Sequence, residues 1–482
     1  MIKGRTAVTT RYNPVSQSVI EELKRIVGAK NVITDPDRLA AYSHDETPAD
    51  RYGHMPEVAF IPRTAEEISR VLRLANRELI PITPRGAGSG LSGGAIPVFG
   101  GIVISTEKMN RILEIDEKNM VAVVEPGVVT NEINDQVAQR GLFFAGYPMS
   151  LETCSIGGNV AENAGGGKAV KYGVTGRYVM GIEVVLPTGE IIMLGGKRVK
   201  DVTGYDLKQL IVGSEGTLGI ITKIIVKLLP LPTARIDLLV LFKNVRSAID
   251  MVWEIMTQAH IVPTTVEFMD ALSFHTSLNY LNEQIDCKEA GAMILIEVDG
   301  NDFERLEAEA ETIGELCLSH GAKEVYVADN ATTQERVWGV RRSIPEAFMA
   351  SNPDQSIEDI VVPIASIPQL MPELARIAQM YGIQIPCYGH AADGNLHATL
   401  IRDPVTTEEE WIEKEQKALR DLYSVVQRFG GAISGEHGIG SKRKKYFMEG
   451  AINPTLVVLM RRIKKAFDPK GIMNPGKIFD LE

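Results

Sequence analysis

A glycine-rich stretch between residues 82 and 95 places the strongest constraint on how this chain folds. It reads Ile82-Thr-Pro-Arg-Gly-Ala-Gly-Ser-Gly-Leu-Ser-Gly-Gly-Ala95 and follows the apolar run Glu78-Leu-Ile-Pro-Ile82. Five of the nine residues from 86 to 94 are glycine. Because glycine lacks a Cβ atom, successive backbone N–H groups can face one concavity, which suits a phosphate or pyrophosphate. We therefore predict that this stretch binds a dinucleotide cofactor.

The sequence context argues against two familiar phosphate-binding motifs. Residues 88–93 match G-x-G-x-x-G, but that fingerprint requires a following helix whose N-terminus holds the pyrophosphate. Here a proline, two glycines and the β-type run Ile102-Val-Ile-Ser105 follow, so no helix is expected. A Walker loop would need glycine at position 162 and Ser or Thr after Gly167-Lys168, and the chain has Glu162 and Ala169.

Length and charge narrow the class of protein. A chain of 482 residues is too long for one core and suits two to four domains. The formal net charge of -11 argues against a partner made of nucleic acid or anionic lipid, for which a basic stripe would be expected. The basic run Lys442-Arg-Lys-Lys445 is as consistent with a solvated loop as with a functional site.

Targeting signals and cysteine spacing also carry information. No stretch approaches 18 consecutive apolar residues, and Met1-Ile-Lys-Gly-Arg-Thr6 lacks a signal-peptide core, so we expect a cytoplasmic protein without a transmembrane segment. The four cysteines lie far apart, which indicates neither a disulfide framework nor an iron–sulfur cluster. Electrons leaving this chain would therefore pass to another molecule.

Hydrophobic periodicity predicts an α+β protein. Before a linker at Leu229-Pro-Leu-Pro232, we expect helices at 17–28 and 64–78 and strands at 57–62, 78–82, 102–105, 120–124, 181–186, 190–194 and 218–226. After it, we expect a βαβ-type layer with helices on one face, formed by strands at 236–242 and 292–298 and helices at 245–259, 302–320, 367–381 and 407–429. The Pro- and Gly-rich tail at 467–479 is expected to return to the first domain without forming a helix.

Two more glycine-rich segments lie in the first half of the chain. They are Ser155-Ile-Gly-Gly-Asn-Val-Ala-Glu-Asn-Ala-Gly-Gly-Gly167 and Gly213-Ser-Glu-Gly-Thr-Leu-Gly-Ile220. Each alone is more typical of a tight turn than of a ligand site. Three such segments in one domain favour a large cofactor, and glycines would admit a planar ligand close to the backbone.

A histidine pair occurs in Cys387-Tyr-Gly-His-Ala-Ala-Asp-Gly-Asn-Leu-His-Ala398. Gly389 and Asp393-Gly-Asn395 oppose a helix and favour a turn. If the flanking runs pair as a hairpin, His390 and His397 would lie opposite each other with Cβ atoms ~5 Å apart, close enough to share a metal ion. Two polar histidines of a turn are the alternative.

A second segment, Gly435-Glu-His-Gly-Ile-Gly440, places a carboxylate next to an imidazole. Neighbouring side chains of an extended segment point in opposite directions. Glu436 could therefore complete a His-His-Glu metal site while His437 remains available as a base. A solvated glutamate on a loop is the alternative interpretation.

Together these residues resemble the FAD-linked oxidases of the vanillyl-alcohol-oxidase type, in the branch that includes D-lactate dehydrogenase, glycolate oxidase and D-2-hydroxyglutarate dehydrogenase. The resemblance runs from about residue 40 to the C-terminus and is carried by the motifs at 84–90, 213–219, 389–397, 435–438 and Asn474-Pro-Gly-Lys477. It implies a two-subdomain FAD-binding domain at 1–230, an α+β cap domain over the isoalloxazine at 231–430, and a C-terminal segment at 431–482 that rejoins the FAD domain.

The resemblance also implies which residues bind FAD. The first loop would wrap the pyrophosphate, and the other two glycine segments would lie along the rest of the flavin. That first loop contains no histidine for a covalent link, so we expect noncovalent FAD. The implied cofactor-binding residues are Pro84, Arg85, Gly86, Ala87, Gly88, Ser89, Gly90, Ser155, Gly157, Gly158, Asn159, Gly165, Gly213, Gly216, Ile220 and Asn474.

By the same resemblance, His390, His397 and Glu436 would hold a divalent metal such as zinc, manganese or iron that binds the substrate's hydroxyl and carboxylate oxygens. His437 would take the hydroxyl proton while the Cα hydrogen leaves as hydride to flavin N5. Arg341 or Arg342 would grip the substrate carboxylate, and Arg341 falls where the hydroxyglutarate branch has a substrate arginine.

The expected reaction is oxidation of a small D-2-hydroxy acid, D-lactate first and glycolate second. The hydroxyglutarate branch's accompanying threonine and lysine fall at Pro345 and near Ile357, which favours a monocarboxylate over D-2-hydroxyglutarate. Electrons would go to an electron-transferring flavoprotein or an iron–sulfur subunit. The alternatives are a D-2-hydroxyglutarate dehydrogenase, a transferase resembling alkyl-glycerone-phosphate synthase, a metal-dependent hydrolase and a non-catalytic flavin subunit. A hydrolase would leave the three glycine segments unexplained.

Overall fold

A computed structural model describes residues 11–451 and 453–481, which divide into two compact units. The first unit combines the chain up to Ala164 with Thr175–Pro230 and His437–Glu482. The second unit comprises Gly165–Val174 and Leu231–Glu436. The segment from Met1 to Thr6, expected to lack a signal peptide, lies outside the described residues. No helix within those described ranges is both long enough and apolar enough to cross a membrane.

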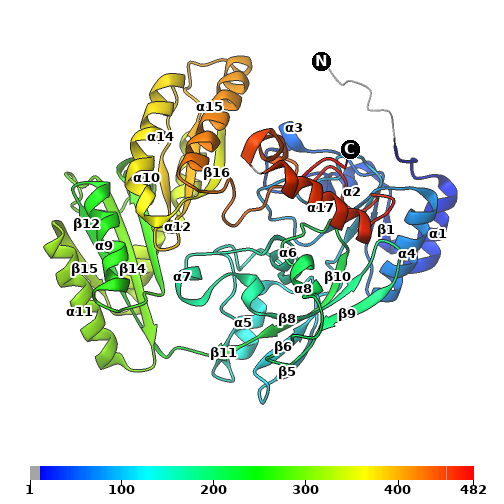
Figure 1. The fold of residues 1–482 in the computed structure, drawn as a ribbon, viewed down its shortest axis with the longest axis horizontal. Helices are drawn as coiled ribbons and strands as arrows, with labels where there is room; N and C mark the ends of the chain where they lie inside the picture. Colours follow the sequence, from blue (N-terminus) through cyan, green and yellow to red (C-terminus); the bar gives the residue numbers. More distant parts are fainter. Residues whose placement is uncertain (1–10, 452, 482) are drawn as a thin grey trace. The chain divides into compact units, whose positions relative to one another are not determined.

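A small sheet in the first unit carries the glycine-rich stretch. Its strand order is β1-β2-β4-β3, with β2, β4 and β3 parallel. Figure 1 shows β1 beside α1 and α4. As expected, no helix follows the glycines, because the chain runs from β3 directly to β4. The bounds are β1 Val32–Ile33, β2 Val58–Phe60, β3 Ile82–Arg85, β4 Ile102–Ser105, α1 Gln17–Val27, α2 Pro36–Leu39, α3 Ala49–Tyr52 and α4 Ala65–Glu78.

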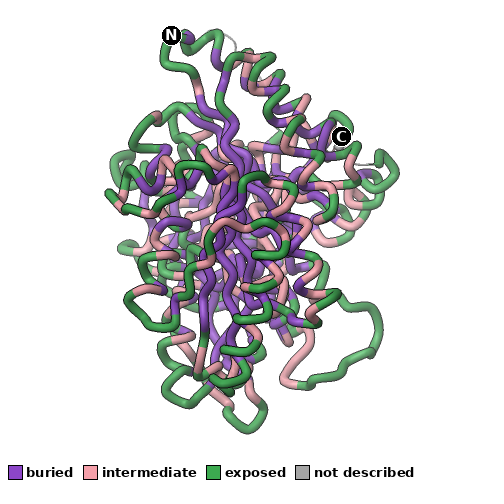
Figure 2. The backbone as a smooth tube through the Cα atoms, turned by 90° about the vertical axis from the view of Figure 1, so that its left-hand side faces the viewer, coloured by how far each residue is buried: buried purple, intermediate pink, exposed green. Residues whose placement is uncertain are grey.

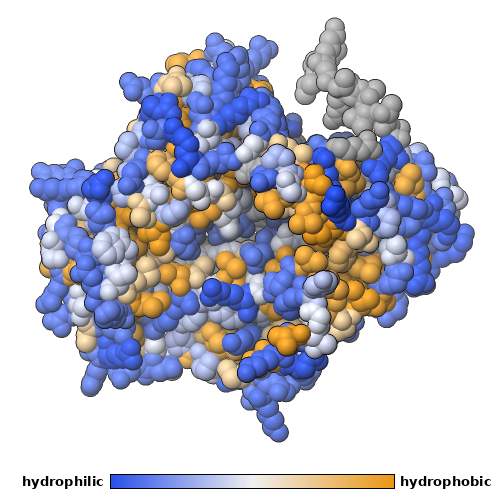
Figure 3. Space-filling model, viewed as in Figure 1, coloured by the Kyte–Doolittle hydropathy of each residue, from blue (hydrophilic) through white to orange (hydrophobic). Residues whose placement is uncertain are grey.

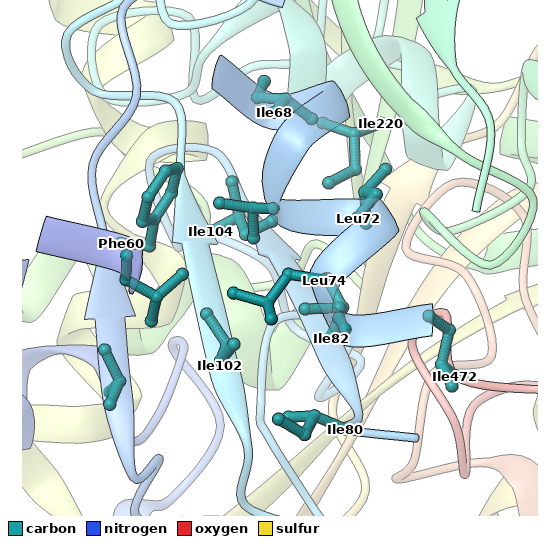
Figure 4. Packing of buried hydrophobic residues seen from close by; sticks show 14 of the residues in the cluster. Phe60, Ile68, Leu72, Leu74, Ile80, Ile82, Ile102, Ile104, Ile220 and Ile472 are labelled. Atoms are coloured by element: carbon teal, nitrogen blue, oxygen red, sulfur yellow. The ribbon is translucent and has the colours of Figure 1, made fainter. Parts of the chain in front are cut away.

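The apolar faces of α1 and α4 form the core above this sheet. Thr64 caps α4 by accepting a hydrogen bond from Glu67 N, which fixes where the helix begins. Ile68 and Leu72 of α4 then pack against the isoleucines of β3 and β4, together with Ile472 from the C-terminal tail (Figure 4). Since β3 is anchored in this core, the glycine loop that leaves its end starts from a rigid element.

A second, antiparallel sheet completes the first unit. Its order is β5-β6-β10-β8-β9, and a two-stranded pair, β7 with β11, lies outside it. The bounds are β5 Ile112–Asp116, β6 Val121–Val124, α5 Thr130–Ala138, β7 Leu142–Phe143, α6 Ile156–Glu162, β8 Val179–Val185, β9 Ile191–Gly195, α8 Leu207–Ile211, β10 Ile220–Lys227 and β11 Leu229–Pro230.

The C-terminal segment is built into the first unit. It contains α16 Lys444–Tyr446 and α17 Pro454–Phe467, and after α17 the tail is irregular, as its prolines and glycines predict. Ile472 O accepts a hydrogen bond from Ile82 N, so the tail lies beside β3. Apolar side chains gather on the surface over α17, where Leu456, Val458 and Leu459 are 46%, 45% and 52% exposed (Figure 3).

The second unit is organised around one seven-stranded sheet in which every neighbouring pair is antiparallel. Its order is β15-β12-β14-β13-β17-β18-β16. In Figure 2 the buried stretches of backbone are drawn in purple, and β12 and β14 are buried along most of their length. The bounds are β12 Ala234–Phe242, β13 Thr265–Asp270, β14 Ala292–Gly300, β15 Ala322–Ala328, β16 Gln355–Val361, β17 Cys387–His390 and β18 Asn395–Ile401.

Helices cover both faces of this sheet, so the expectation of helices on one face was wrong. Helices α10, α12 and α13 pack on the side chains of Leu239, Leu241 and Met293, whereas α9, α11 and α15 pack over the opposite side (Figure 1). The near-continuous apolar runs of β12 and β14 are typical of strands buried on both faces. The bounds are α7 Ala169–Tyr172, α9 Val245–Thr257, α10 Ala271–Leu281, α11 Phe303–Ser319, α12 Ala331–Arg342, α13 Ile344–Ser351, α14 Ile367–Tyr381 and α15 Glu408–Arg428.

One face of the sheet is apolar at one end and polar at the other. The apolar end lies under α10, α12 and α13. The polar end carries a set of mostly buried side chains contributed by six strands, which we call the polar row: Arg235, Asp237, Thr265, Glu267, Glu297, Asp299, Asp359, His390, Asn395 and His397. Buried polar groups of this number require partners, and these come both from within the row and from neighbouring segments of the second unit.

The tail's contribution to the core predicts a measurable stability difference. Replacing Ile472, which is fully buried, with alanine should lower the free energy of unfolding by about 2–5 kcal/mol because it leaves a cavity. The same substitution at Ile191, which is 38% exposed on β9, should change it by no more than about 0.5 kcal/mol. Urea unfolding of the wild type and both variants measures this, and equal losses would contradict the described packing of the tail.

Candidate functional sites

The glycine stretch forms an open loop at the end of β3. Among the described residues, the backbone N–H groups of Gly88, Ser89, Gly90 and Leu91 donate no hydrogen bond, and these four residues are only partly buried. The Arg85 side chain folds back beneath the loop, where Nη1 donates to His44 O over 2.6 Å. The loop thus offers consecutive free N–H donors of the kind that hold an anionic phosphate.

Gly88 is required at its position for two independent reasons. Its φ of +77° is a left-handed conformation, which costs an L-residue roughly 1–2 kcal/mol. A Cβ atom there would also lie 2.1 Å from Nη2 of Arg85. These features fit a cradle in which the backbone itself approaches a ligand.

The second glycine segment folds differently from the loop that its composition suggests. Ile156–Glu162 form the helix α6, with Ser155 as the N-cap residue. Gly157 packs against Pro126, where a Cβ would lie 2.5 Å from Pro126 Cβ, so this glycine permits a close helix contact. Ser155 Oγ accepts a hydrogen bond from Ala87 N over 3.2 Å, which places the start of α6 beside the first loop. The Asn159 amide donates to Thr130 Oγ1 within the same unit.

The remaining residues proposed to bind FAD differ in their backbone conformation and in the groups that they contact. Gly213 and Gly216 both adopt positive φ, and a Cβ at Gly216 would lie 2.4 Å from Pro84 Cγ, so this segment also borders β3. The Ile220 side chain lies in the hydrophobic core (Figure 4). Asn474 donates to the carbonyls of Gly94 and Glu215 and thereby ties the tail to the loop. A Cβ atom added at Gly158 would meet Ser155 Oγ and otherwise open space within 4 Å. Gly165 belongs to the second unit.

The two histidines of the second unit lie on a β-hairpin, as the turn residues predicted. Strands β17 and β18 are joined by residues 391–394, and His390 pairs with Asn395 while Tyr388 pairs with His397. The histidines are therefore diagonal neighbours, and the expectation that they lie directly opposite was wrong by two residues in register. Their ring centroids are still only 5.7 Å apart.

Glu436 brings a carboxylate to both imidazoles. Its Oε1 lies 3.6 Å from His390 Nε2 and 3.4 Å from His397 Nε2. His390 is 2% exposed, and its Nε2 makes no hydrogen bond to a described residue. A buried nitrogen without a hydrogen bond, aimed at a carboxylate and a second imidazole, fits a divalent metal because imidazole and carboxylate are ordinary ligands of zinc, manganese and iron.

Asp359 holds the segment that carries Glu436, a role that the sequence did not reveal. Its Oδ2 accepts hydrogen bonds from Ser434 Oγ, Gly435 N and Glu436 N over 2.7–2.9 Å, and its Oδ1 accepts one from Asn395 Nδ2 over 2.6 Å. The ligand atoms of Asp359, His397 and Glu436 lie within 4.8 Å of one another. Because its oxygens already accept four bonds, Asp359 orients Glu436 and is a poorer candidate for a metal ligand.

Glu267 is a second buried carboxylate that the sequence analysis missed. It lies on β13 and accepts hydrogen bonds from His390 Nδ1 over 2.6 Å and from Arg341 Nε over 2.7 Å. Burial raises the pKa of Glu267, but His390 and Arg341 outweigh that effect and lower it to about 2. Burial lowers the pKa of His390, yet the carboxylates of Glu267 and Glu436 raise it well above the usual value. A glutamate in the middle of a β-type run, Thr265-Val-Glu-Phe-Met269, was the available signal.

The two arginines considered for a substrate carboxylate have different environments. Arg341 is 3% exposed and lies over the ring of Tyr388, 4.9 Å from its centroid. Among the described residues its guanidinium donates only the Nε bond to Glu267, so its terminal nitrogens remain available for a ligand. Arg342 is paired with Glu335 at the surface. Arg341 is therefore the better candidate.

His437 directly follows Glu436 and is the first residue of the C-terminal segment of the first unit. The expectation of an extended backbone here was wrong, because the chain bends at 435–437. The argument from opposite-pointing neighbours therefore no longer applies, and the role of His437 as a base stays a prediction.

These features define a cofactor-dependent enzyme with a phosphate-type glycine loop in one unit and a His-His-carboxylate site in the other. Residues 56–195 match the family model of the FAD binding domain, and residues 231–478 match that of the FAD linked oxidases, C-terminal domain. The chain belongs to the FAD-linked oxidases, and FAD is its cofactor. This confirms the family that the sequence motifs indicated.

Individual relatives agree with this assignment. Glycolate oxidase subunit GlcD of Bacillus subtilis is 40% identical over 465 residues, which cover 96% of this chain and 97% of the relative. A D-lactate dehydrogenase of Anaerostipes hadrus is 37% identical over 475 residues, covering 97% and 98%. The crystal structure of p-cresol methylhydroxylase with bound substrate covers 96% of both chains with a TM-score of 0.77 at 19% identity. The expected α+β fold of the vanillyl-alcohol-oxidase type is thereby confirmed.

The geometry of the first loop predicts the effect of a single methyl group. Gly88→Ala should greatly reduce bound flavin, because the new Cβ displaces Arg85 and distorts the free N–H donors. Gly204→Ala is the matched control, since Gly204 has a similar φ of +83° but nothing within 4 Å of the added Cβ. Flavin content per protein, read from visible absorbance, should fall only in the first variant. Equal flavin content in both variants would contradict the cradle.

Proposed function

We propose that this enzyme oxidises a small D-2-hydroxy acid to the 2-oxo acid, with D-lactate as the first candidate and glycolate as the second. Support comes from the named activities of two relatives, a glycolate oxidase subunit and a D-lactate dehydrogenase. The D configuration follows the name of the second relative. The reaction removes two electrons and two protons from the substrate, and FAD accepts the electrons.

The observation that carries this proposal is the arrangement around Glu267. His390 and Arg341 donate to the two oxygens of this one carboxylate, and His390 also faces Glu436 and His397. A 2-hydroxy acid presents a hydroxyl and a carboxylate on neighbouring carbons. A metal-type ligand set and a guanidinium held side by side are matched to those two groups.

Each residue of the site has a separate role in the proposed reaction. His390, His397 and Glu436 would hold a divalent metal, which supplies Lewis acidity toward the substrate oxygens. Arg341 would bind the carboxylate through its terminal nitrogens and so orient the Cα–H bond. His437 would remove the hydroxyl proton as the general base. FAD would be bound noncovalently by the loop from Pro84 to Gly90, which contains no histidine.

The charge balance of the polar row favours a monocarboxylate. Two cations that border the row are already paired with its acids, Lys168 with Glu297 over 2.9 Å and Lys171 with Asp299 over 2.5 Å, whereas Arg341, bonded to Glu267 through Nε, keeps terminal nitrogens for one substrate carboxylate. A substrate with a second carboxylate, such as 2-hydroxyglutarate, would add an uncompensated negative charge to this face. D-Lactate and glycolate avoid that penalty.

The electrons would then leave FAD for a protein partner. The four cysteines lie at widely separated positions in the chain and form no cluster-binding motif, so we expect the acceptor to be a separate protein. An electron-transferring flavoprotein or an iron–sulfur subunit would serve as the acceptor.

Anaerobic flavin reduction tests the proposal. We expect the yellow holoenzyme to lose its visible absorbance on addition of D-lactate, to respond to glycolate more slowly, and to respond poorly to L-lactate and to D-2-hydroxyglutarate. Stopped-flow absorbance in the absence of oxygen measures each rate. Faster reduction by D-2-hydroxyglutarate than by D-lactate would replace the proposed substrate with the dicarboxylate.

The role of His437 gives a second prediction. His437→Ala should slow flavin reduction by D-lactate by about 10²–10⁴-fold, because a positioned base contributes that range, while flavin and metal content stay unchanged. His320→Ala is the control, since His320 is paired with Glu254 in the second unit, outside the polar row. An unchanged reduction rate in His437→Ala would remove its assignment as the base.

A further inference from the structure

We infer that Glu267 is the positioning residue that fixes both His390 and Arg341 for the reaction, an inference that rests on the proposed function. Glu267 is fully buried, and its Oε1 and Oε2 accept from His390 Nδ1 and Arg341 Nε respectively. One rigid carboxylate therefore sets the distance and angle between a metal-type ligand and a carboxylate-binding guanidinium.

The hydrogen bond to His390 determines which ring nitrogen can bind a metal. When Nδ1–H donates to Glu267, Nε2 is the ring nitrogen that faces Glu436, and it is the nitrogen whose lone pair a metal would use in place of a proton. Carboxylate partners of this kind orient metal-binding histidines and raise their basicity, and their loss weakens metal affinity about 10–100-fold. Glu267 thus acts on the metal through His390 without touching it.

The hydrogen bond to Arg341 has a parallel effect on the guanidinium. It uses Nε and leaves the two terminal nitrogens without a hydrogen bond to a described residue. The guanidinium carbon lies over the ring of Tyr388, 4.9 Å from its centroid, so the ring packs against this group. A carboxylate bound by these two nitrogens would be held by two parallel hydrogen bonds.

Glutamine cannot replace glutamate at this position. Both partners of Glu267 are donors, whereas a glutamine side chain offers one acceptor oxygen and one donor nitrogen. If the amide nitrogen faced Arg341, two donors would meet. If it faced His390, Nδ1 would have to accept, and the proton would move to Nε2, where a metal should bind. Either orientation disables one of the two groups.

Gly167, in a segment beside the sheet, packs closely against Glu267 and His390. The segment Gly165–Val174 lies along the polar row, and Lys168 and Lys171 anchor it through Glu297 and Asp299. A Cβ at Gly167 would lie 2.4 Å from Glu267 Oε1 and 3.4 Å from His390 Nδ1. Gly167→Ala would therefore displace the Glu267 side chain without changing its charge. Comparing this variant with Glu267→Gln separates the effect of side-chain position from the effect of charge.

The test uses FAD-loaded enzyme that has been stripped of metal and then titrated with Mn²⁺. We expect Glu267→Gln to weaken Mn²⁺ binding, followed by electron paramagnetic resonance of the free ion, by about 10–100-fold, and Gly167→Ala to weaken it in the same direction. Glu358→Gln is the matched control, because Glu358 is a fully buried glutamate of the same sheet whose side chain lies on the opposite face from Glu267 and His390 and accepts hydrogen bonds from Ser356 and Tyr423. Its Mn²⁺ affinity should match the wild type.

Oxalate tests the effect of Glu267 on Arg341, because oxalate carries carboxylate groups but is not oxidised by this reaction. Calorimetry of Mn²⁺-saturated enzyme should give weaker oxalate binding in Glu267→Gln than in Glu358→Gln. Wild-type Mn²⁺ and oxalate affinities in Glu267→Gln would overturn the inference, as would equal losses in Glu358→Gln. A wild-type enzyme that binds no Mn²⁺ would instead reject the metal site of the proposed function. Normal binding without flavin reduction by D-lactate would reject only the proposed substrate.

Discussion

The second unit relies on keeping several carboxylates charged inside a protein. Removing a carboxylate from water costs several kcal/mol unless cations or N–H donors replace the lost hydration. Along the polar row that replacement is nearly complete: Glu267 has His390 and Arg341, Glu297 has Lys168, and Asp299 has Lys171 and Tyr172. The compensation explains why a short segment from an earlier part of the chain belongs to this unit, since Gly165–Val174 supplies both lysines and the tyrosine.

Asp237 shows what happens where compensation is weaker. It is paired across the strands with Glu297, which is itself an acid, and its one hydrogen bond from Trp338 Nε1 is 3.2 Å long. Burial and the neighbouring Glu297 raise the pKa of Asp237 to about 7. The contrast with Glu267, whose pKa falls to about 2, arises from the cations rather than from depth, because both side chains are fully buried. A carboxylate that is to orient two donors must stay ionised, and of these two acids Glu267 has the cationic partners for that.

Local signals in the sequence were sufficient for the regular elements. Caps and apolar spacing placed α1, α4, α14 and α15 to within a residue or two, because these helices bury one stripe and begin at a side-chain cap or a proline. The helix α6 could not be predicted, because Gly157 and Gly158 lower helix propensity. It forms there because Gly157 allows close contact with Pro126, a tertiary contact that no local pattern contains.

The same distinction holds for the candidate metal site. His390, His397 and Glu436 were identifiable because histidines beside glycines and an Asp-Gly turn stand out from their surroundings. Their diagonal register could not be derived, since it depends on the four-residue turn that pairs His390 with Asn395. Glu267 and Asp359 lie inside β-type runs, 123 and 38 residues before His390 and His397 respectively, so only strand order reveals them.

The order of strands also explains why these two carboxylates have complementary tasks. Strand β13 flanks β17 on one side and places Glu267 behind His390, while β16 flanks β18 on the other and places Asp359 beside His397 and under the backbone of Glu436. The hairpin is thus held between two acids, one bonded to His390 Nδ1 and the other holding the segment that carries Glu436. Because both acids already accept several hydrogen bonds, the three proposed ligands would be organised before a metal binds, and binding would cost little reorganisation. A site with three protein ligands would leave coordination positions for two substrate oxygens.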